Sequence, residues 1–273
     1  MKVNTTLFYS AGMNTCPNVL FERIKFVSRI KQHLYKEEKS MLKVGIMQPY
    51  FVPYIGYWQL LNAVDVYVVY DDVNYINRGW INRNRILVNG EPQYFNLLLE
   101  AASQNKLINE IEICKDEKHI QKLFRTLEIN YRKAPFYAET MELLRRILNN
   151  PEKNLAFFLY EQIICIAEYL DIDTEIVLSS SLKKDCSLRG EEKILEICRR
   201  LNATEYYNAI GGRELYSQDN FAQNQMTLKF LATNDICYKQ YGEHFYGNLS
   251  IIDVLMFNGK KVTKELLKEF HTV

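Results

Sequence analysis

One stretch of the chain changes from strand spacing to helical spacing and back again in its apolar positions. Val44 to Met47 form a short apolar run that ends at Gln48-Pro49, because proline lacks an N–H group and restricts the residue before it. Pro53 suits the first turn of a helix, and apolar residues recur at helical spacing from Tyr54 to Asn62, with only Asn62 interrupting them. Val64 to Tyr70 is rich in valine and tyrosine. The pattern predicts a strand, a helix and a second strand.

A β-hairpin is expected next. Two strand-like runs, Arg85–Val88 and Tyr94–Leu99, flank the segment Asn89-Gly90-Glu91-Pro92. Asn-Gly favours a tight turn between antiparallel strands.

The pattern becomes helical from Glu117 to Leu170, with breaks at Ala134-Pro135 and Asn150-Pro151 that divide it into about three helices. The remaining predicted elements are strands at Glu175–Leu178, Glu205–Asn208 and Met226–Leu231, and helices at Arg189–Leu201, Leu249–Asn258 and Thr263–Phe270. Strands that alternate with helices indicate an α/β fold. We expect a mainly parallel sheet flanked by helices, with a β-hairpin and an inserted helical region near residues 117–170.

The first forty residues have a different character. A polar, irregular start precedes a helical pattern from Val19 to Lys39. Residues 1–40 are therefore interpreted as an N-terminal extension, which is either a helix docked on the body or the product of a translation start assigned upstream of Met41. Residues 41–273 are expected to form a single α/β domain.

Composition narrows the classes of function. The chain has 273 residues, of which 48% are hydrophobic and 25% charged, and its formal net charge is +1. A nucleic-acid-binding protein usually has a clear basic excess, so this balance argues against such a partner. The most apolar helical segment, Leu155–Ile166, is interrupted by Glu161 and Gln162 and is too short to cross a bilayer. No membrane span is therefore expected.

The six cysteines are scattered without a CxxC pair or the spacing of a zinc site. They are Cys16, Cys114, Cys165, Cys186, Cys198 and Cys237. A chain of this size does not need disulfides for stability, so reduced thiols in the cytoplasm are expected. The sequence indicates no metal site and specifies no cofactor or oligomeric state.

The loop after the first strand is a candidate binding site. Gln48, Tyr54, Gly56 and Tyr57 lie beyond the carboxyl end of that strand and around the start of a helix. Ligands of open α/β sheets bind at such positions, and a helix N-terminus favours anions. The alternative is that the tyrosines are packing residues and that Gly56 is a helix–sheet contact.

Asp71 and Asp72 follow the second predicted strand. A carboxylate at this position can bind a metal, orient a hydroxyl group or act as a base. Adjacent residues on a strand point to opposite sides, so only one of the two is expected to face a site, and we choose Asp71. The alternative is a turn or cap residue.

The segment Trp80-Ile81-Asn82-Arg83-Asn84 combines an indole, two amides and a guanidinium group. Trp80, Asn82, Arg83 and Asn84 suit a polar, planar or anionic ligand. If the segment is a strand, however, Arg83 points away from the other three side chains. The alternative is a turn braced by asparagine side chains.

Two further groups lie nearer the C-terminus. Gly211 and Gly212 follow a predicted strand and can present backbone N–H groups to an anion, although a Gly-Gly pair is often only a turn. His244 lies in a polar loop and is a candidate for acid–base chemistry, although single histidines are commonly structural.

Four motifs in order resemble the WbqC-like family. They are GIMQPYFVPYIGYW, VVYDDVNYINRGWINRN, YYNAIGGRELY and FYGNLSIIDVLMFNG, and they extend from about Gly45 to Gly259. The motif positions are Gln48, Pro49, Gly56, Asp71, Trp80, Asn82, Arg83, Asn84, Gly211, Gly212, Tyr216, Asp253 and Gly259.

The resemblance implies a cytoplasmic role in bacterial O-antigen or other surface-polysaccharide biosynthesis. The leading hypothesis is an enzyme that transfers a small group, acyl or aminoacyl, onto a nucleotide-linked sugar. In this hypothesis the first loop, Gly211 and Gly212 hold phosphate, Arg83 neutralises charge, and Asp71 or His244 moves a proton. The alternatives are a non-catalytic nucleotide-sugar binding protein and a scaffold protein of the same pathway.

Overall fold

A computed structural model of the protein describes residues 41–273, which form one compact unit. The expectation of an N-terminal extension concerns residues 1–40, which lie outside the described residues.

The centre of this unit is a six-stranded sheet with the spatial order β10-β9-β8-β1-β2-β7. Its strands are β1 (Lys43–Met47), β2 (Val66–Val69), β7 (Glu175–Leu178), β8 (Glu205–Ala209), β9 (Thr227–Thr233) and β10 (Phe270–Thr272). All neighbouring pairs are parallel except β9 and β10. The prediction of an α/β fold with a mainly parallel sheet is therefore confirmed.

The five parallel strands, counted among themselves along the chain, are arranged in the order 3-2-1-4-5. This is the order of doubly wound α/β sheets, in which the chain leaves the central strand in one direction and later returns to its other side. The switch point therefore lies between β1 and β8, where Gly45 is the neighbour of Tyr207.

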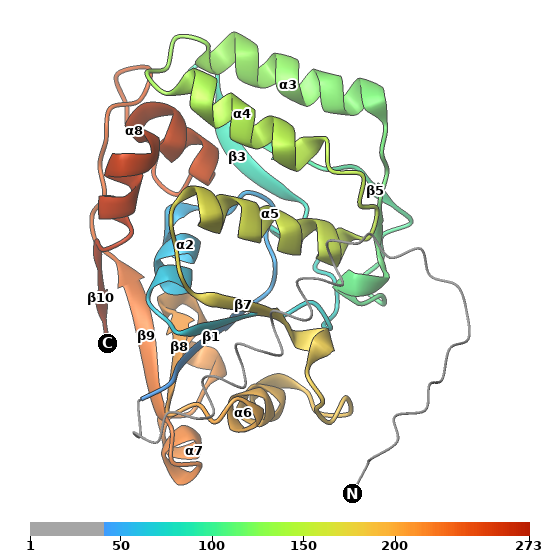
Figure 1. The fold of residues 1–273 in the computed structure, drawn as a ribbon, viewed down its shortest axis with the longest axis vertical. Coiled ribbons are helices and arrows are strands. Elements are labelled where there is room, and N and C mark those ends of the chain that lie inside the picture. The colour runs from blue at the N-terminus through green and yellow to red at the C-terminus, as the bar shows by residue number, and fades with distance from the viewer. Residues whose placement is uncertain (1–40) are drawn as a thin grey trace, which may run out of the picture. The chain divides into compact units, whose positions relative to one another are not determined.

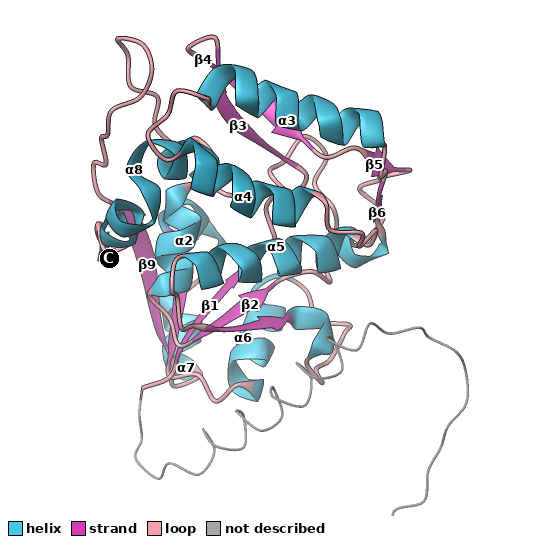
Figure 2. Cartoon of the chain, turned by 45° about the horizontal axis from the view of Figure 1, so that its top comes forward, coloured by secondary structure: helices cyan, strands magenta, loops and turns pink. Residues whose placement is uncertain are grey.

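Helices cover both faces of the sheet. They are α2 (Ile55–Asn62), α3 (Glu117–Tyr131), α4 (Tyr137–Leu148), α5 (Leu155–Tyr169), α6 (Gly190–Arg200), α7 (Gln218–Gln223) and α8 (Ile251–Leu266). Figures 1 and 2 show α2 and α5 on one side of the sheet and α6 and α7 on the other. The three helices α3, α4 and α5 confirm the predicted helical region and both of its proline breaks.

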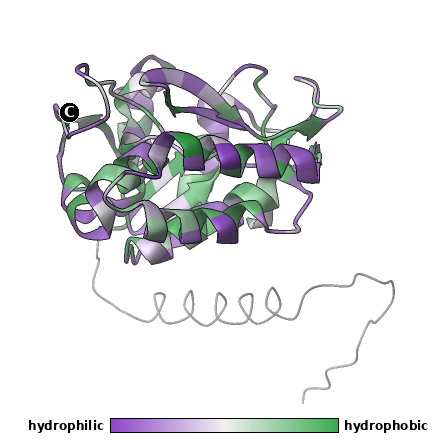
Figure 3. Cartoon of the chain, turned by 90° about the horizontal axis from the view of Figure 1, so that it is seen from above, coloured by the Kyte–Doolittle hydropathy of each residue, from purple (hydrophilic) through white to green (hydrophobic). Residues whose placement is uncertain are grey.

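Apolar side chains on the two faces explain this layering. On the α2 side, Tyr57 and Trp58 are completely buried, and the Tyr57 ring contacts the Tyr67 ring of β2 at 5.5 Å. On the α6 and α7 side, Tyr206 of β8 stacks on Phe221 at 5.2 Å. Figure 3 shows helices banded in hydrophilic and hydrophobic colours, as expected for helices that bury one face.

The predicted hairpin consists of β3 (Arg83–Val88) and β4 (Glu91–Asn96). Asn89 (φ 54°) and Gly90 (φ 83°) form the turn, and both have the positive φ that a two-residue turn between twisted strands requires. A smaller pair, β5 (Leu99–Glu100) and β6 (Glu112–Ile113), follows it and was not predicted.

The C-terminal prediction was partly wrong. The described α8 runs through Gly259, whose φ of 62° kinks it, and ends at Leu266. The helical segment after Gly259 corresponds to the expected helix at Thr263–Phe270, but it ends at Leu266, and Phe270–Thr272 instead forms β10. A side chain at position 259 would overlap the Phe136 ring, because its Cβ atom would lie 2.5 Å from that ring. The short helix α7 was not predicted either.

Candidate functional site

Two unpaired carboxamides lie at the switch point of the sheet. Gln48 follows β1 and is half-buried, whereas Asn208 lies near the end of β8 and is 7% exposed. The Asn208 Oδ1 atom accepts a hydrogen bond from the Ala209 N–H group at 2.8 Å. Among the described residues, nothing accepts from the Asn208 Nδ2 group or bonds the Gln48 side chain. Both amides can therefore bond a ligand.

The glycine pair lies directly beside Asn208. Gly211 and Gly212 belong to the 3₁₀ helix η3 (Ile210–Leu215), which follows β8. A Cβ atom at Gly212 would lie 2.5 Å from the Asn208 Nδ2 atom, whereas the space around Gly211 is open. Glycine at position 212 thus leaves room for the Asn208 amide, and glycine at 211 leaves the backbone accessible.

Tyr70 follows β2 and Tyr216 follows η3, and the two hydroxyls are near enough to affect each other electrostatically. The Tyr216 ring contacts the Tyr206 ring at 5.5 Å, and burial raises the pKa of the Tyr216 hydroxyl. Burial also raises the pKa of the Tyr70 hydroxyl, with smaller contributions from Asp72 and Tyr216 nearby. Both hydroxyls are therefore neutral at physiological pH and can donate or accept hydrogen bonds.

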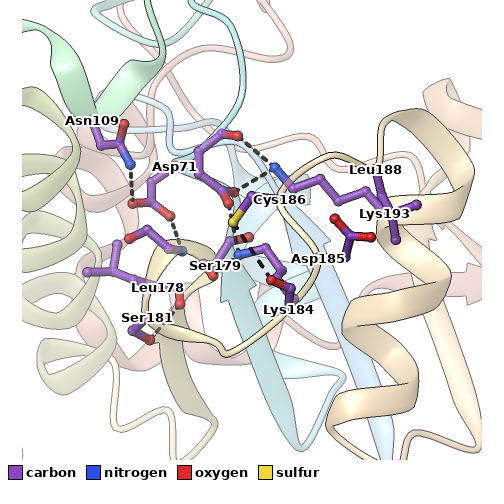
Figure 4. A network of polar contacts seen from close by, with 12 residues as sticks. Asp71, Asn109, Leu178, Ser179, Ser181, Lys184, Asp185, Cys186, Leu188 and Lys193 are labelled. Carbon is purple, nitrogen blue, oxygen red and sulfur yellow. Dashed lines mark hydrogen bonds and ion pairs between the residues drawn. The ribbon is translucent and has the colours of Figure 1, made fainter.

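Asp71 is tied into the structure at the end of β2. Its side chain is 1% exposed, and its Oδ1 atom accepts from the Ser180 N–H group at 2.9 Å. The Oδ2 atom lies 3.4 Å from the Asn109 amide nitrogen. Figure 4 shows these contacts, which connect Asp71 to η2 (Ser179–Ser181) after β7 and to η1 (Ile108–Glu110). Asp71 thus joins three segments.

Asp72 holds two lysines, Lys184 and Lys193, through its carboxylate. Its carboxylate oxygens lie 2.8 Å from the Lys184 ammonium and 3.1 Å from that of Lys193. The Lys193 ammonium also donates to the Asp72 carbonyl oxygen at 2.7 Å, and Lys184 donates to the Ser179 carbonyl oxygen. Only 1% of the Lys184 side chain and 3% of the Lys193 side chain are exposed.

The two carboxyl groups have opposite pKa shifts. Burial raises the pKa of Asp71, and the hydrogen bonds from Ser180 only partly offset it. Burial also opposes the charge of Asp72, but the contacts with Lys184 and Lys193 outweigh it and lower the pKa. Asp71 therefore holds its proton more strongly than a free aspartate, and Asp72 stays charged.

The first loop contributes packing at two of its predicted positions. Tyr57 is completely buried, and its hydroxyl donates to the Gln48 carbonyl oxygen at 3.3 Å. At Gly56 a Cβ atom would lie 2.5 Å from the Tyr54 ring and 2.8 Å from Thr233 Oγ1 of β9. The packing alternative therefore describes Tyr57 and Gly56, because protein atoms already fill their surroundings. Tyr54 is half-buried against the same glycine.

Val52 in this loop has a strained backbone. Its φ is 40°, a conformation that a β-branched residue rarely adopts, and its side chain is completely buried. The Gln162 side chain accepts from its N–H group at 3.0 Å. Asn84 and Ser250 donate to its carbonyl oxygen at 3.0 and 2.7 Å. Three distant residues thus hold the loop in one conformation.

The two asparagines of the predicted Trp80–Asn84 group brace backbone. Asn84 donates to the carbonyl oxygens of Phe51 and Val52, and Asn82 donates to that of Leu97 at 3.0 Å. This arrangement matches the bracing alternative, although the segment from Arg83 onward is a strand. Trp80 and Arg83, in contrast, remain partly exposed.

The structure does not connect His244 to the carboxyl ends of the parallel strands. His244 is exposed in the loop between β9 and α8. The contacts of this loop run from Tyr246 to Glu91 of β4 and from Gln240 to Asp253 of α8. No described contact connects His244 to Asp71.

Sequence reasoning missed Tyr70, Asn208, Lys184 and Lys193. Tyr70 and Asn208 carried a usable signal, because each lies at the carboxyl end of a correctly predicted strand. The lysines carried none, since a lysine in a loop or helix is usually exposed.

The described residues include no cluster of three histidine, cysteine or acidic side chains that would suit a metal ion. The five cysteines among them are free thiols, and burial raises the pKa of Cys198 to about 12, which disfavours the reactive thiolate. None of the helices in residues 41–273 has the length and apolarity needed to span a membrane.

Comparisons with known proteins place this chain in a family. No solved structure matches it. A relative described as "Uncharacterized protein Rv1507c" from Mycobacterium tuberculosis is 29% identical over 221 residues, which cover 80% of this chain and 94% of the relative. The model of the WbqC-like protein family matches residues 48–265, which include Gln48, Asn208 and α8 up to Glu265. The chain therefore belongs to the WbqC-like protein family.

Proposed function

We propose that this protein is a cytoplasmic transferase that acts on a nucleotide-linked sugar, or a similar precursor, in bacterial surface-polysaccharide biosynthesis. Membership of the WbqC-like family and the doubly wound order of the sheet support the proposal. Sheets of this order bind ligands beyond the carboxyl ends of their strands at the switch point.

The observation that carries the proposal is the pair of amide side chains, Gln48 and Asn208, at the ends of the two strands that flank the switch point. The Asn208 Nδ2 group has no acceptor among the described residues and is free to donate to a ligand. A sugar hydroxyl or a phosphate oxygen is the kind of acceptor that its Nδ2 group lacks within the described chain.

Each remaining part of the ligand has a candidate partner in the proposal. Gly211 and Gly212 present backbone to the phosphate, as turns rich in N–H groups do. Arg83 neutralises negative charge, since it forms no ion pair with a described carboxylate. Asp71 is favoured over His244 as the proton-transfer group, because Asp71 and Asn208 both lie at the carboxyl ends of parallel strands.

The first test is a thermal-shift screen of the full chain with nucleotide-linked sugars, followed by turnover assays with the ligands that bind. A ligand at a hundred times its Kd stabilises a protein by about 2.7 kcal/mol, which raises the melting temperature by about 5–11 °C for a domain of this size. We expect Asn208→Ala to weaken binding by at least tenfold. Asn62→Ala changes an exposed residue at the end of α2 and serves as the matched control.

Two outcomes contradict the proposal. The first is the absence of a thermal shift with every nucleotide-linked sugar, which leaves the scaffold alternative. The second is an Asn208→Ala variant that binds like the wild type, which removes the switch point from the site.

One observation favours the second candidate, a non-catalytic nucleotide-sugar binding protein. Asp71 is 1% exposed and already accepts hydrogen bonds from Ser180 and Asn109. An Asp71→Asn variant separates the two functions. In an enzyme it abolishes turnover and retains binding, whereas in a binding protein there is no turnover to lose.

A further inference from the structure

Four side chains form a guanidinium–aromatic surface on the β3–β4 hairpin: Trp80, Arg83, Arg85 and Tyr94. The two rings lie 6.4 Å apart and are 38% and 56% exposed. The Arg83 guanidinium lies over the Tyr94 ring at 4.2 Å, and that of Arg85 lies 5.7 Å from the Trp80 ring. Cations and aromatic faces alternate across this surface.

The positive charge of the surface is not neutralised by the described chain. Arg83 donates to the carbonyl oxygens of Gly79 and Arg78, which carry no net charge. The Nε atom of Arg85 is buried and has no hydrogen-bond partner among the described residues. Neither these two arginines nor Arg78 forms an ion pair with a described carboxylate. A bound anion can pair with the guanidinium charge that these side chains present at the surface.

The backbone beneath the surface is held in place by two sets of contacts. Arg85 pairs with Tyr94 in the β3–β4 ladder, so the two side chains share one face of the hairpin. Asn84 fastens β3 to the first loop through the carbonyl oxygens of Phe51 and Val52. The four side chains therefore start from a fixed backbone, which lowers the entropic cost of binding.

We infer that this surface binds a nucleoside phosphate, with the base on the Trp80 and Tyr94 rings and phosphate oxygens on Arg85 and Arg83. Bases stack on aromatic side chains irrespective of their identity, and the planar guanidinium group bonds two phosphate oxygens at once. The inference rests on the proposed function, because it assigns the nucleoside end of the proposed substrate to the hairpin.

The hairpin and the switch point between β1 and β8 are close enough to share one extended ligand. The Phe51 N–H group donates to the Trp80 carbonyl oxygen at 3.2 Å. Phe51 follows Gln48 by three residues, a span of at most about 11 Å. The surface around Trp80 therefore begins within a short distance of the amides at the switch point.

The chain reports on its own binding, because it has two tryptophans and Trp58 is completely buried. ADP and UDP are titrated into the full chain while tryptophan fluorescence is recorded, with inorganic pyrophosphate as the probe without a base. We expect both nucleotides to quench the fluorescence with similar Kd values and pyrophosphate to bind at least tenfold more weakly. Trp80→Phe keeps an aromatic ring and is expected to remove the fluorescence change.

Isothermal titration calorimetry with the same ligands then measures the Kd of each variant. Arg85→Gln and Tyr94→Ala are expected to raise the Kd for ADP at least tenfold. Arg132→Gln changes an exposed arginine after α3 and is expected to leave the Kd unchanged.

The inference is wrong if Arg85→Gln and Tyr94→Ala bind ADP like the wild type, or if pyrophosphate binds as tightly as ADP. In these cases a nucleotide-linked sugar that still depends on Asn208 leaves the proposed function standing. If no nucleotide and no nucleotide-linked sugar binds, both proposals are overturned.

Discussion

The Lys193 ammonium lies 3.1 Å from the Oδ1 atom of Asp72 and so joins α6 to the end of β2. Lys184 approaches the other oxygen of the same carboxylate at 2.8 Å. One half-buried carboxylate therefore contacts both the segment that leads from β7 into α6 and α6 itself. This segment borders the candidate site. The position of its backbone depends on the ion pairs that Asp72 forms with Lys184 and Lys193.

Asp72→Asn is expected to destabilise the protein by about 3–5 kcal/mol, because it leaves two buried ammonium groups without a counter-charge. Urea unfolding of the full chain measures the free energy. Asp185→Asn is the matched control, since Asp185 is exposed in the same segment and, within residues 41–273, bonds only the nearby Ser187. Equal stability of the two variants would show that the Asp72 ion pairs contribute nothing.

The stability difference between wild type and Asp72→Asn is expected to depend on pH. The pKa of Asp72 is lower in the folded state than its usual value of 3.8. A carboxyl group with a lowered folded pKa stabilises the protein above its unfolded pKa, and this stabilisation is lost as the pH falls through the folded pKa. The difference is therefore full at pH 7 and shrinks below pH 3.8, which urea unfolding across this range measures. A difference independent of pH contradicts the expectation.

Val52→Gly is expected to be at least as stable as Val52→Ala, against the usual order of glycine and alanine. Alanine keeps the unfavourable positive φ of 40°, whereas glycine relieves a strain of about 1–2 kcal/mol. Both variants lose apolar contacts, so the comparison isolates the effect of the backbone conformation at position 52 on stability. Thermal unfolding of the two variants checks it, and a clearly less stable glycine variant would show that the loop is not strained.

Tyr131→Phe is expected to destabilise the protein by about 1–3 kcal/mol. The Tyr131 hydroxyl donates to Asp253 at 2.8 Å and accepts from the Leu87 N–H group at 2.8 Å, so its removal leaves two buried groups unpaired. Tyr137→Phe is the control, because the Tyr137 hydroxyl forms no hydrogen bond with a described residue and such a change usually alters stability by no more than about 0.5 kcal/mol. Urea unfolding ranks the two, and equal effects would assign Tyr131 a packing role only.

The order of elements was accessible from the sequence because its signals are local. The Val-rich run at β2, the Asn89-Gly90 turn and the breaks before Pro135 and Pro151 each act within a few residues. The end of the last helix was predicted wrongly. The helical pattern at 263–270 competes with the pairing of β10 to β9, and periodicity does not report such a long-range interaction.

The candidate site was less accessible, for two physical reasons. Tyr57 and Tyr70 look alike in sequence, yet Tyr57 is buried in the α2 layer and Tyr70 lies at the strand end. The partners of Asp72 also come from far along the chain, since Lys193 is 121 residues away. Sequence spacing reveals neither the depth of a side chain nor a contact of that range.

The pairing of β1 with β8 has a consequence for how the protein is made. Thr204, which precedes β8, contacts Leu42 across 162 residues. Most of the chain must therefore be synthesised before β1 can pair with β8. Sheets with such distant pairings fold slowly, and open strand edges favour aggregation in the meantime. Synthesis that pauses between β2 and β8 would leave the β1 edge open, so the risk of aggregation is expected to be greatest in this interval.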